Sequence, residues 1–241
     1  MISTAPMLLD ATGRVLLLTG AAGGIGRAVA ALYTSAGGHV AGLDLVASPG
    51  VAACDVTSEA ALADAVDTVM ACHGRLDDVV HCAGIVGAGP LADLALADWH
   101  KVMDANLTSG FLLARATAAA LGAQRGRLVF LSSTNGRNGG GLLSGPAYAA
   151  AKAGLINLTR YLAREWATAG VRVNCVAPGP VDTPMLDRLQ PQVREQLARS
   201  MLTGDIASAS DVARAIAFLL SANAAAMTGT VLNPSGGMVF D

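Results

Sequence analysis

The feature that most constrains the fold of this chain is a glycine-rich turn between an apolar run and a helical pattern. Residues 15–19 form a short, unbroken apolar run of the kind that a buried parallel strand shows. The turn at residues 20–26 (GAAGGIG) follows, and an alanine-rich helical pattern continues to about residue 36. In this context the glycines permit close approach, and the helix N-terminus offers free N–H groups to a phosphate. The segment therefore predicts a dinucleotide-binding unit; a turn that serves packing alone is the alternative.

Strand-like runs and helical patterns alternate along the rest of the chain. The strand-like runs lie near residues 15–19, 39–43, 51–54, 78–82, 127–131, 171–177 and 230–232. The helical patterns lie at residues 24–36, 58–72, 98–121, 144–169 and 209–221. This alternation predicts an α/β fold, a doubly wound (Rossmann-type) parallel sheet of about seven strands with helices on both faces. No linker or composition break divides the 241 residues, so we expect a single dinucleotide-binding and catalytic domain spanning residues 1–241.

Asp44 ends the second strand-like run and suggests which dinucleotide binds. A carboxylate at this place accepts hydrogen bonds from the ribose hydroxyls of NAD and repels the 2′-phosphate of NADP. No Lys or Arg lies between Arg27 and Arg75, so few cations are available to neutralise a 2′-phosphate. Arg27 could still turn toward the ribose, and Asp44 could simply face solvent at a strand end. The balance favours NAD.

Composition excludes several classes of function. Hydrophobic residues make up 53% of the chain and charged residues 14%, which suits a sheet buried on both faces. The net charge of -2 gives no electrostatic reason to expect nucleic acid or an anionic membrane surface. No apolar stretch is long enough for a membrane span, and residues 1–10 lack the pattern of a secretory signal, so we expect a cytoplasmic protein. The scattered cysteines and histidines predict no metal site.

Tyr148 and Lys152 are four residues apart in a helical pattern and are candidates for proton transfer. Positions i and i+4 share one face of a helix, so both side chains can reach a single site. A free tyrosine titrates near ~10, and a neighbouring ammonium favours the phenolate and lowers the pKa. Such a pair is more commonly a partly buried ring beside a solvated charge, so its meaning depends on the other motifs.

Taken together, the motifs resemble the short-chain dehydrogenase/reductase family in its single-domain form. The resemblance runs from about Gly13 to Gly237 and rests on five motifs in order: Thr19-Gly20-x-x-x-Gly24-x-Gly26, Asn106, Ser133, Tyr148-x-x-x-Lys152 and Asn174-x-x-x-Pro178-Gly179-x-x-x-Thr183. It implies that the catalytic residues are Asn106, Ser133, Tyr148 and Lys152. Ser133 would hold the substrate oxygen, although Ser132 and Thr134 are rivals, and Asn106 would belong to a water-linked proton relay to Lys152.

The resemblance also implies a cofactor site. Its members are Gly20, Gly23, Gly24, Ile25, Gly26, Asp44, Asp55, Val56, Ala83, Gly84, Tyr148, Lys152, Pro178, Gly179, Val181 and Thr183. Asp55 and Val56 would contact the adenine, whereas Val181 and Thr183 would hold the nicotinamide carboxamide. Residues 184–207 would form a substrate lid.

The chain departs from the family pattern at several places. Only six residues, 45–50, connect the second and third runs, so the helix that commonly covers this position should be missing. Residues 139–141 (GGG) look like an insertion between Ser133 and Tyr148 that reshapes one wall of the site. His81-Cys82 stands where the family has two asparagines, which removes their side-chain hydrogen bonds, and a further local change is expected at residues 233–237.

These observations predict an NAD(H)-dependent oxidoreductase that interconverts a secondary alcohol, such as a polyol or sugar-derived alcohol, and a ketone. The alternative is a 3-oxoacyl-thioester (acyl-carrier-protein) reductase, which residues 148–176 also resemble, although the NAD signature argues against it. A non-catalytic dinucleotide-binding relative is a third reading. Partners should be a small-molecule substrate and further copies of the chain, because helical patterns 98–121 and 144–169 are apolar around more than one face. The resemblance implies a homotetramer or homodimer.

Overall fold

Seven parallel strands form the central sheet, in the order β3-β2-β1-β4-β5-β6-β9. The strands are β1 (Val15–Thr19), β2 (His39–Asp44), β3 (Val51–Ala53), β4 (Asp78–His81), β5 (Arg127–Leu131), β6 (Arg172–Val176) and β9 (Val231–Leu232). The computed structural model describes residues 9–240, so the expectation drawn from the first ten residues falls mostly outside the described part. Strand order reverses between β1 and β4, which confirms the predicted doubly wound sheet.

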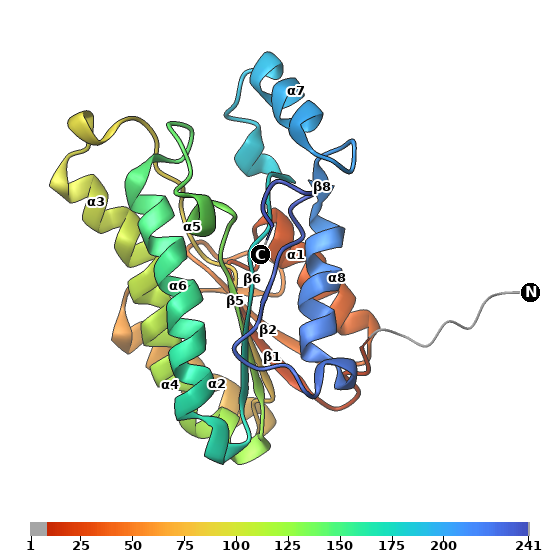
Figure 1. Ribbon diagram of the computed structural model, residues 1–241. Helices are drawn as coiled ribbons and strands as arrows, with labels where there is room; N and C mark the ends of the chain where they lie inside the picture. The colour runs from red at the N-terminus through yellow and green to blue at the C-terminus, as the bar shows by residue number, and fades with distance from the viewer. Residues whose placement is uncertain (1–8, 241) are drawn as a thin grey trace, which may run out of the picture.

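Helices cover both faces of this sheet (Figure 1). On one face lie α2 (Glu59–His73), α4 (Ser109–Gln124) and α6 (Gly145–Glu165), and on the other lie α1 (Gly24–Ser35) and α8 (Ala209–Leu220). Alternate residues of β1 pack against the helices on opposite faces of the sheet. Leu17 packs into the first core, whereas Leu16 and Leu18 pack into the second. This period of two explains why β1 reads as an uninterrupted apolar run.

Shorter elements lie at both ends of the sheet. They are β7 (Val181–Asp182), β8 (Ala207–Ser208), α3 (Leu96–Met103), α5 (Asn135–Asn138), α7 (Pro191–Ser200), and the single turns η1 (Leu91–Asp93), η3 (Ala167–Ala169), η4 (Pro184–Leu186) and η5 (Ala222–Ala224). The expected lid contains η4 and α7, which project above the sheet in Figure 1. No helix of the described residues is long and apolar enough to cross a membrane.

The helix expected over residues 98–121 is in fact interrupted. A π-helical turn, η2 (Asp104–Thr108), separates α3 from α4. Asn106 is buried in this turn, and its side-chain amide donates to the Val102 carbonyl, four residues earlier, at 2.8 Å. Side chains that bond to the backbone in this way compete with the regular helical ladder, and π-turns are frequent at functional sites. The interruption therefore marks Asn106 as a candidate for function.

The connection between β2 and β3 has no helix among its six residues, as the sequence predicted. Ser48 and Val51 exchange two backbone hydrogen bonds of 3.0 and 2.8 Å, which turn the chain back sharply. The next residues pair with β2 in parallel, with Val51 opposite Gly42. Leu45 and Val46 are left 69% and 72% exposed beside the end of β2. The site that begins at this end is therefore more open than a full crossover helix would leave it.

Candidate active site

One cavity of about 1190 Å³ lies over the carboxyl ends of the strands, where an open α/β sheet binds its ligands. Every residue predicted for the site lines this cavity: Gly20, Gly23, Gly24, Ile25, Gly26, Asp44, Asp55, Val56, Ala83, Gly84, Asn106, Ser133, Tyr148, Lys152, Pro178, Gly179, Val181 and Thr183. The chain thus brings residues from every third of its length to one place. Residues from the lid and from the glycine insertion at 139–141 line the same cavity.

The glycine turn leaves room for a pyrophosphate. Gly20 adopts φ +69°, and a Cβ atom there would lie 2.7 Å from the Ala83 nitrogen, so only glycine fits. A Cβ atom on Gly26 would overlap the Gly20 carbonyl oxygen. No side chain caps the start of α1, and its first turn contains no acidic residue. The helix dipole and free N–H groups therefore face the cavity without competition from this helix's own side chains.

Asp44 stands at the adenosine end of the cavity. Its two carboxylate oxygens accept hydrogen bonds from the N–H groups of Ala22, at 2.9 Å, and Leu45, at 2.8 Å. Arg27 also lines this end, and its guanidinium donates to the Ala22 carbonyl. Asp55 is on the same rim, where hydrogen bonds from Thr57 lower its pKa. The two carboxylates make this end of the cavity acidic, with Arg27 as its nearby cation.

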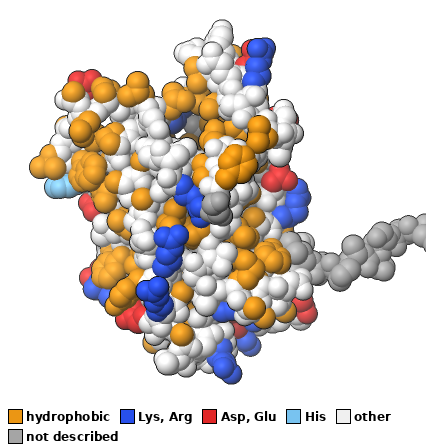
Figure 2. All heavy atoms as spheres, viewed as in Figure 1, with side chains coloured by type: hydrophobic (Ala, Val, Ile, Leu, Met, Phe, Trp, Pro, Cys, Tyr) orange, Lys and Arg blue, Asp and Glu red, His pale blue; other side chains and the backbone are white. Residues whose placement is uncertain are grey.

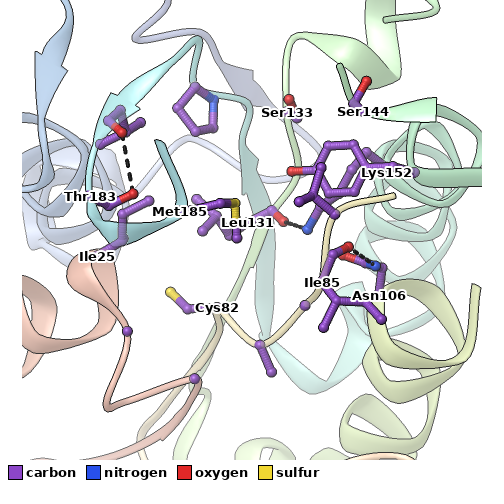
Figure 3. Close-up of a pocket in the computed structure, with 18 of the residues that line it drawn as sticks. Ile25, Cys82, Ile85, Asn106, Leu131, Ser133, Ser144, Lys152, Thr183 and Met185 are labelled. Carbon is purple, nitrogen blue, oxygen red and sulfur yellow. Dashed lines mark hydrogen bonds between the residues drawn. The ribbon is translucent and has the colours of Figure 1, made fainter. Parts of the chain in front are cut away.

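Tyr148 and Lys152 both line the cavity from α6, and Figure 3 shows Lys152 with its hydrogen bond to Leu131. The Lys152 ammonium lies 5.4 Å from the centre of the Tyr148 ring and donates to the Leu131 carbonyl at 2.8 Å. Burial lowers the pKa of Lys152 to about 8. Burial also raises the pKa of Tyr148, against opposing effects from a hydrogen bond with Ser133 and from the charge of Arg188.

The expected effect of Lys152 on Tyr148 therefore needs correction. Lys152 is not among the groups that lower the Tyr148 pKa, and desolvation outweighs the groups that do. The physical reason is that the ammonium itself is buried and is directed at a backbone carbonyl. Proximity on one helix face was correctly inferred, but spacing alone cannot give the sign of a pKa shift.

The geometry separates Ser133 from its two rivals. Ser132 donates its hydroxyl proton to the Lys152 carbonyl at 2.7 Å, and Thr134 donates to the Met238 sulfur at 3.7 Å. Ser133 accepts from the Asn135 N–H at 3.2 Å, and its hydroxyl is one of the groups that lower the pKa of Tyr148. Of the three hydroxyls, Ser133 is therefore the one that influences the Tyr148 phenol.

Asn106 contributes an unpaired oxygen to the floor of the site. Its Nδ2 donates to the Ile85 and Val102 carbonyls, each at 2.8 Å, whereas its buried Oδ1 has no partner among the described residues. A Cβ atom on Gly84 would overlap this Oδ1 and lie 3.4 Å from the Lys152 ammonium. Gly84 therefore lets Asn106 and Lys152 approach the same point, and an orphaned acceptor there suits a bound water.

The segment after β6 closes the other side of the cavity. The Pro178 carbonyl accepts from the Thr134 N–H at 2.9 Å, and the Thr183 hydroxyl donates to the Val181 carbonyl at 3.3 Å. A Cβ atom on Gly24 would lie 2.6 Å from the Thr183 methyl group, so this segment passes directly against the start of α1. Thr183 and Ile25 accordingly lie on the same side of the cavity in Figure 3.

His81 has a role that its sequence context does not indicate. The replacement of the two asparagines does not remove side-chain hydrogen bonding, because the fully buried His81 ring bonds on both sides. Nδ1 lies 2.8 Å from the Thr19 hydroxyl, and Nε2 lies 3.4 Å from the Asn106 carbonyl and 3.2 Å from the Ser109 hydroxyl. Since a carbonyl only accepts, we assign the proton to Nε2, so that Nδ1 accepts from Thr19. The neutral ring thereby connects the end of β1 to the π-turn that holds Asn106.

This histidine gives a prediction for stability against pH. Burial, with the nearby Lys152 charge, lowers the His81 pKa to about 3, whereas an unfolded histidine titrates near ~6.5. Between these values the unfolded chain binds the extra proton, so the free energy of unfolding falls as pH falls. From pH 7 to pH 5, the free energy of unfolding, measured by urea denaturation, should decrease in both proteins. The decrease should be about 1 to 2 kcal/mol smaller in His81→Asn than in the parent protein. The exposed His100, changed to Asn, is the control; equal losses in the parent and the His81 variant would refute the assignment.

The described residues contain no group of three or more His, Cys, Asp or Glu side chains placed to hold a metal ion. The charged residues that line the cavity instead suit an organic cofactor with a phosphate-bearing and a ribose-bearing part.

Comparison with known proteins gives the same picture over nearly the whole chain. A family model described as Enoyl-(Acyl carrier protein) reductase matches residues 20–239. An uncharacterised short-chain type dehydrogenase/reductase of Sinorhizobium fredii is 33% identical over 95% of this chain and 98% of its own. The 3-oxoacyl-acyl-carrier-protein reductase FabG of Escherichia coli is 35% identical over 94% of this chain and 97% of its own.

A solved structure extends this likeness to three dimensions. The structure of a short-chain dehydrogenase/reductase from Brucella melitensis, titled glucose/ribitol dehydrogenase, superposes with a TM-score of 0.90 at 32% identity, covering 97% of this chain and 99% of that one. Fold, motifs and relatives agree. The chain belongs to the short-chain dehydrogenase/reductase family, oxidoreductases of CH–OH groups that bind a nicotinamide dinucleotide.

Proposed function

We propose that this protein is an NAD(H)-dependent oxidoreductase that interconverts a secondary alcohol, such as a polyol or a sugar-derived alcohol, and a ketone. The observation that carries the proposal is the meeting of Ser133, Tyr148 and Lys152 in one cavity with the glycine turn. In that arrangement Tyr148 exchanges the hydroxyl proton, and Ser133 holds the substrate oxygen beside it. Asn106 and Lys152 are proposed to carry the proton onward through a water at the unpaired Asn106 oxygen.

The residues fit a nicotinamide dinucleotide along the whole cavity. The glycine turn and the start of α1 would hold the pyrophosphate, Asp44 the adenosine ribose, and Val181 with Thr183 the carboxamide. When bound, the nicotinamide supplies hydride transfer, and the protein aligns the reacting carbons. The further proposed contacts are Asp55 and Val56 with the adenine, and Ala83, Gly84, Pro178 and Gly179 with the rest of the cofactor.

The preference for NAD gives a second prediction. Asp44 fixes a negative charge where a 2′-phosphate would lie, and Gly23 beside it carries no side chain that could compensate. We expect NAD to bind more tightly than NADP, by isothermal titration. Asp44→Ala should narrow that difference by about fivefold, because it removes repulsion of about 1 kcal/mol.

Asp93→Ala, which removes an exposed carboxylate outside the cavity lining, is the matched control. Tighter binding of NADP by the parent protein would overturn the NAD assignment and would direct attention to Arg27.

A second candidate function is reduction of 3-oxoacyl thioesters. It is favoured by the likeness to the Escherichia coli FabG protein. One panel separates the candidates: secondary alcohols and polyols with NAD, and 3-oxoacyl thioesters with NADH or NADPH, followed by the absorbance of the reduced cofactor. Turnover confined to thioesters would replace the first proposal. Cofactor binding without turnover of any member would leave the non-catalytic reading.

We also propose that the chain acts as a single domain with residues 184–207 as its lid, and that it assembles as a homotetramer or homodimer. Phe111 on α4, Tyr161 on α6 and Leu96 on α3 are 45%, 63% and 69% exposed. Hydrophobic side chains gather on the flank formed by α3 and α4 in Figure 2. Such exposed apolar groups on adjacent helices suit a closed symmetric interface.

The assembly gives a third prediction. Light scattering at micromolar concentration should report an oligomer for the parent protein. Phe111→Glu should shift it toward smaller species, because the interface would then bury an unpaired carboxylate. Leu45→Glu, at an exposed apolar position beside the cofactor site, should leave the mass unchanged. A monomeric parent protein would contradict the proposed assembly.

A further inference from the structure

The three arginines of the lid differ in how their charge is neutralised. Arg194 forms ion pairs with Asp182 and Asp187, and Arg199 pairs with Glu195. Arg188 has no carboxylate partner among the described residues, and of the three it is the one that lines the cavity. Its charge is therefore available to whatever occupies the substrate end of the cavity.

Arg188 is held in place at the mouth of the site. One of its terminal nitrogens donates to the Leu143 carbonyl at 2.7 Å, which connects the lid to the loop that carries the glycine insertion. A guanidinium has five N–H donors in a fixed planar fork, so this bond leaves donors free. Its charge also reaches the reacting phenol, since it is one of the groups that lower the Tyr148 pKa. Arg188 and Tyr148 line the same cavity, so one molecule bound there can contact both.

The other charges near this end do not cancel it. Lys101 and Asp104 also line the cavity and contribute one charge of each sign. Lys152 is buried on the cofactor side and is directed at a backbone carbonyl. Ser144 and Met185, which Figure 3 labels, are uncharged side chains of the same cavity lining. Arg188 is therefore the charged side chain that the lid contributes to the cavity lining.

We propose that Arg188 binds an oxyanion on the substrate, so that the preferred substrates are alcohols and ketones that carry a carboxylate or a phosphate away from the reacting carbon. This inference rests on the proposed oxidoreductase function and specifies its substrate class. A planar guanidinium recognises both oxyanions through paired N–H donors. Closure of the lid over the anion would then bring the hydroxyl group to Tyr148 and Ser133.

The test compares matched substrates in the full-length protein. Three secondary alcohols are oxidised with NAD: a short-chain hydroxy acid, its methyl ester, and an alcohol of similar length that carries a phosphate monoester in place of the carboxylate. For each, kcat/KM is measured at low and high salt. The parent protein should prefer an anionic member over the ester by about tenfold, and the preference should shrink with salt. Whether the acid or the phosphate ranks first identifies the oxyanion.

Arg188→Gln should abolish the preference, because glutamine keeps an N–H donor for the Leu143 carbonyl but carries no charge. Arg199→Gln, which removes an equal charge from the outer side of the lid, should retain it. An equal loss of turnover on the acid and the ester in Arg188→Gln would show a lid latch only and would overturn the inference. So would an absence of preference in the parent protein that still oxidises the ester, an outcome that leaves the proposed function intact.

Binding provides a readout that does not depend on turnover. Titration of a short carboxylic acid and its amide into the NADH-saturated protein should show tighter binding of the acid, lost in Arg188→Gln. If no panel member is oxidised, the proposed function fails, and this titration alone decides the inference: equal binding of acid and amide would refute it.

Discussion

Tyr148→Phe should reduce turnover by about 10²- to 10⁴-fold while the fold and cofactor binding persist. The substitution removes only the hydroxyl and leaves the half-buried ring in place. A positioned general acid/base contributes a factor of this size, and Ser133 alone cannot replace the proton that the phenol exchanges. The measurement is kcat on a substrate from the alcohol panel, with the NAD dissociation constant and circular dichroism recorded in parallel.

The matched control is Tyr161→Phe on the same helix. Tyr161 is 63% exposed and lies outside the cavity lining, so its hydroxyl should be dispensable for turnover. If Tyr148→Phe keeps near-parental turnover, Tyr148 is not the proton-transfer group, and the catalytic assignment fails although the family assignment stands.

Much of the fold could be predicted because its signals are local. Each strand of the parallel sheet is an apolar run, and the glycine turn fixes where β1 ends and α1 begins. The missing helix after Asp44 could be read from the length of the connection alone. The π-turn at Asn106 could not, because residues 98–121 carry a helical pattern throughout and the distortion arises from hydrogen bonds to Ile85 and Val102.

The site was predicted as a set of residues, whereas their electrostatics were not. A motif gives residue types and order, and these placed Ser133, Tyr148 and Lys152 in one cavity. The direction of the Tyr148 pKa depends on burial, which spacing does not give. The bonds of His81 depend on which strands lie side by side: Thr19 pairs with His81 across β1 and β4, and only the folded sheet creates that contact.

Lys152→Met separates a catalytic role from a structural one. The buried ammonium loses hydration, as its lowered pKa of about 8 reflects, so an apolar side chain of similar length should not destabilise the fold by more than about 1 kcal/mol. Removing the buried charge relieves its lost hydration and favours the folded state, whereas the loss of the hydrogen-bond donor to the Leu131 carbonyl disfavours it. Turnover should nevertheless fall by about 10²-fold or more, and NAD should bind more weakly, because one ammonium is proposed to serve both the proton relay and the nicotinamide ribose.

The pH dependence of stability identifies the same ammonium independently of activity. An unfolded lysine titrates near ~10.4, so between about pH 8 and pH 10 the unfolded chain binds one more proton than the folded chain at this position. The free energy of unfolding of the parent protein should therefore rise with pH in this window relative to Lys152→Met, as urea denaturation at pH 8 and pH 10 can measure.

The chain's other lysine, Lys101, is exposed, and Lys101→Met should retain both the parental pH dependence and NAD binding. If the free energy of unfolding has the same pH dependence in the parent and in Lys152→Met, Lys152 is not a buried ammonium. Its proposed roles in the proton relay and in binding the nicotinamide ribose would then also be refuted.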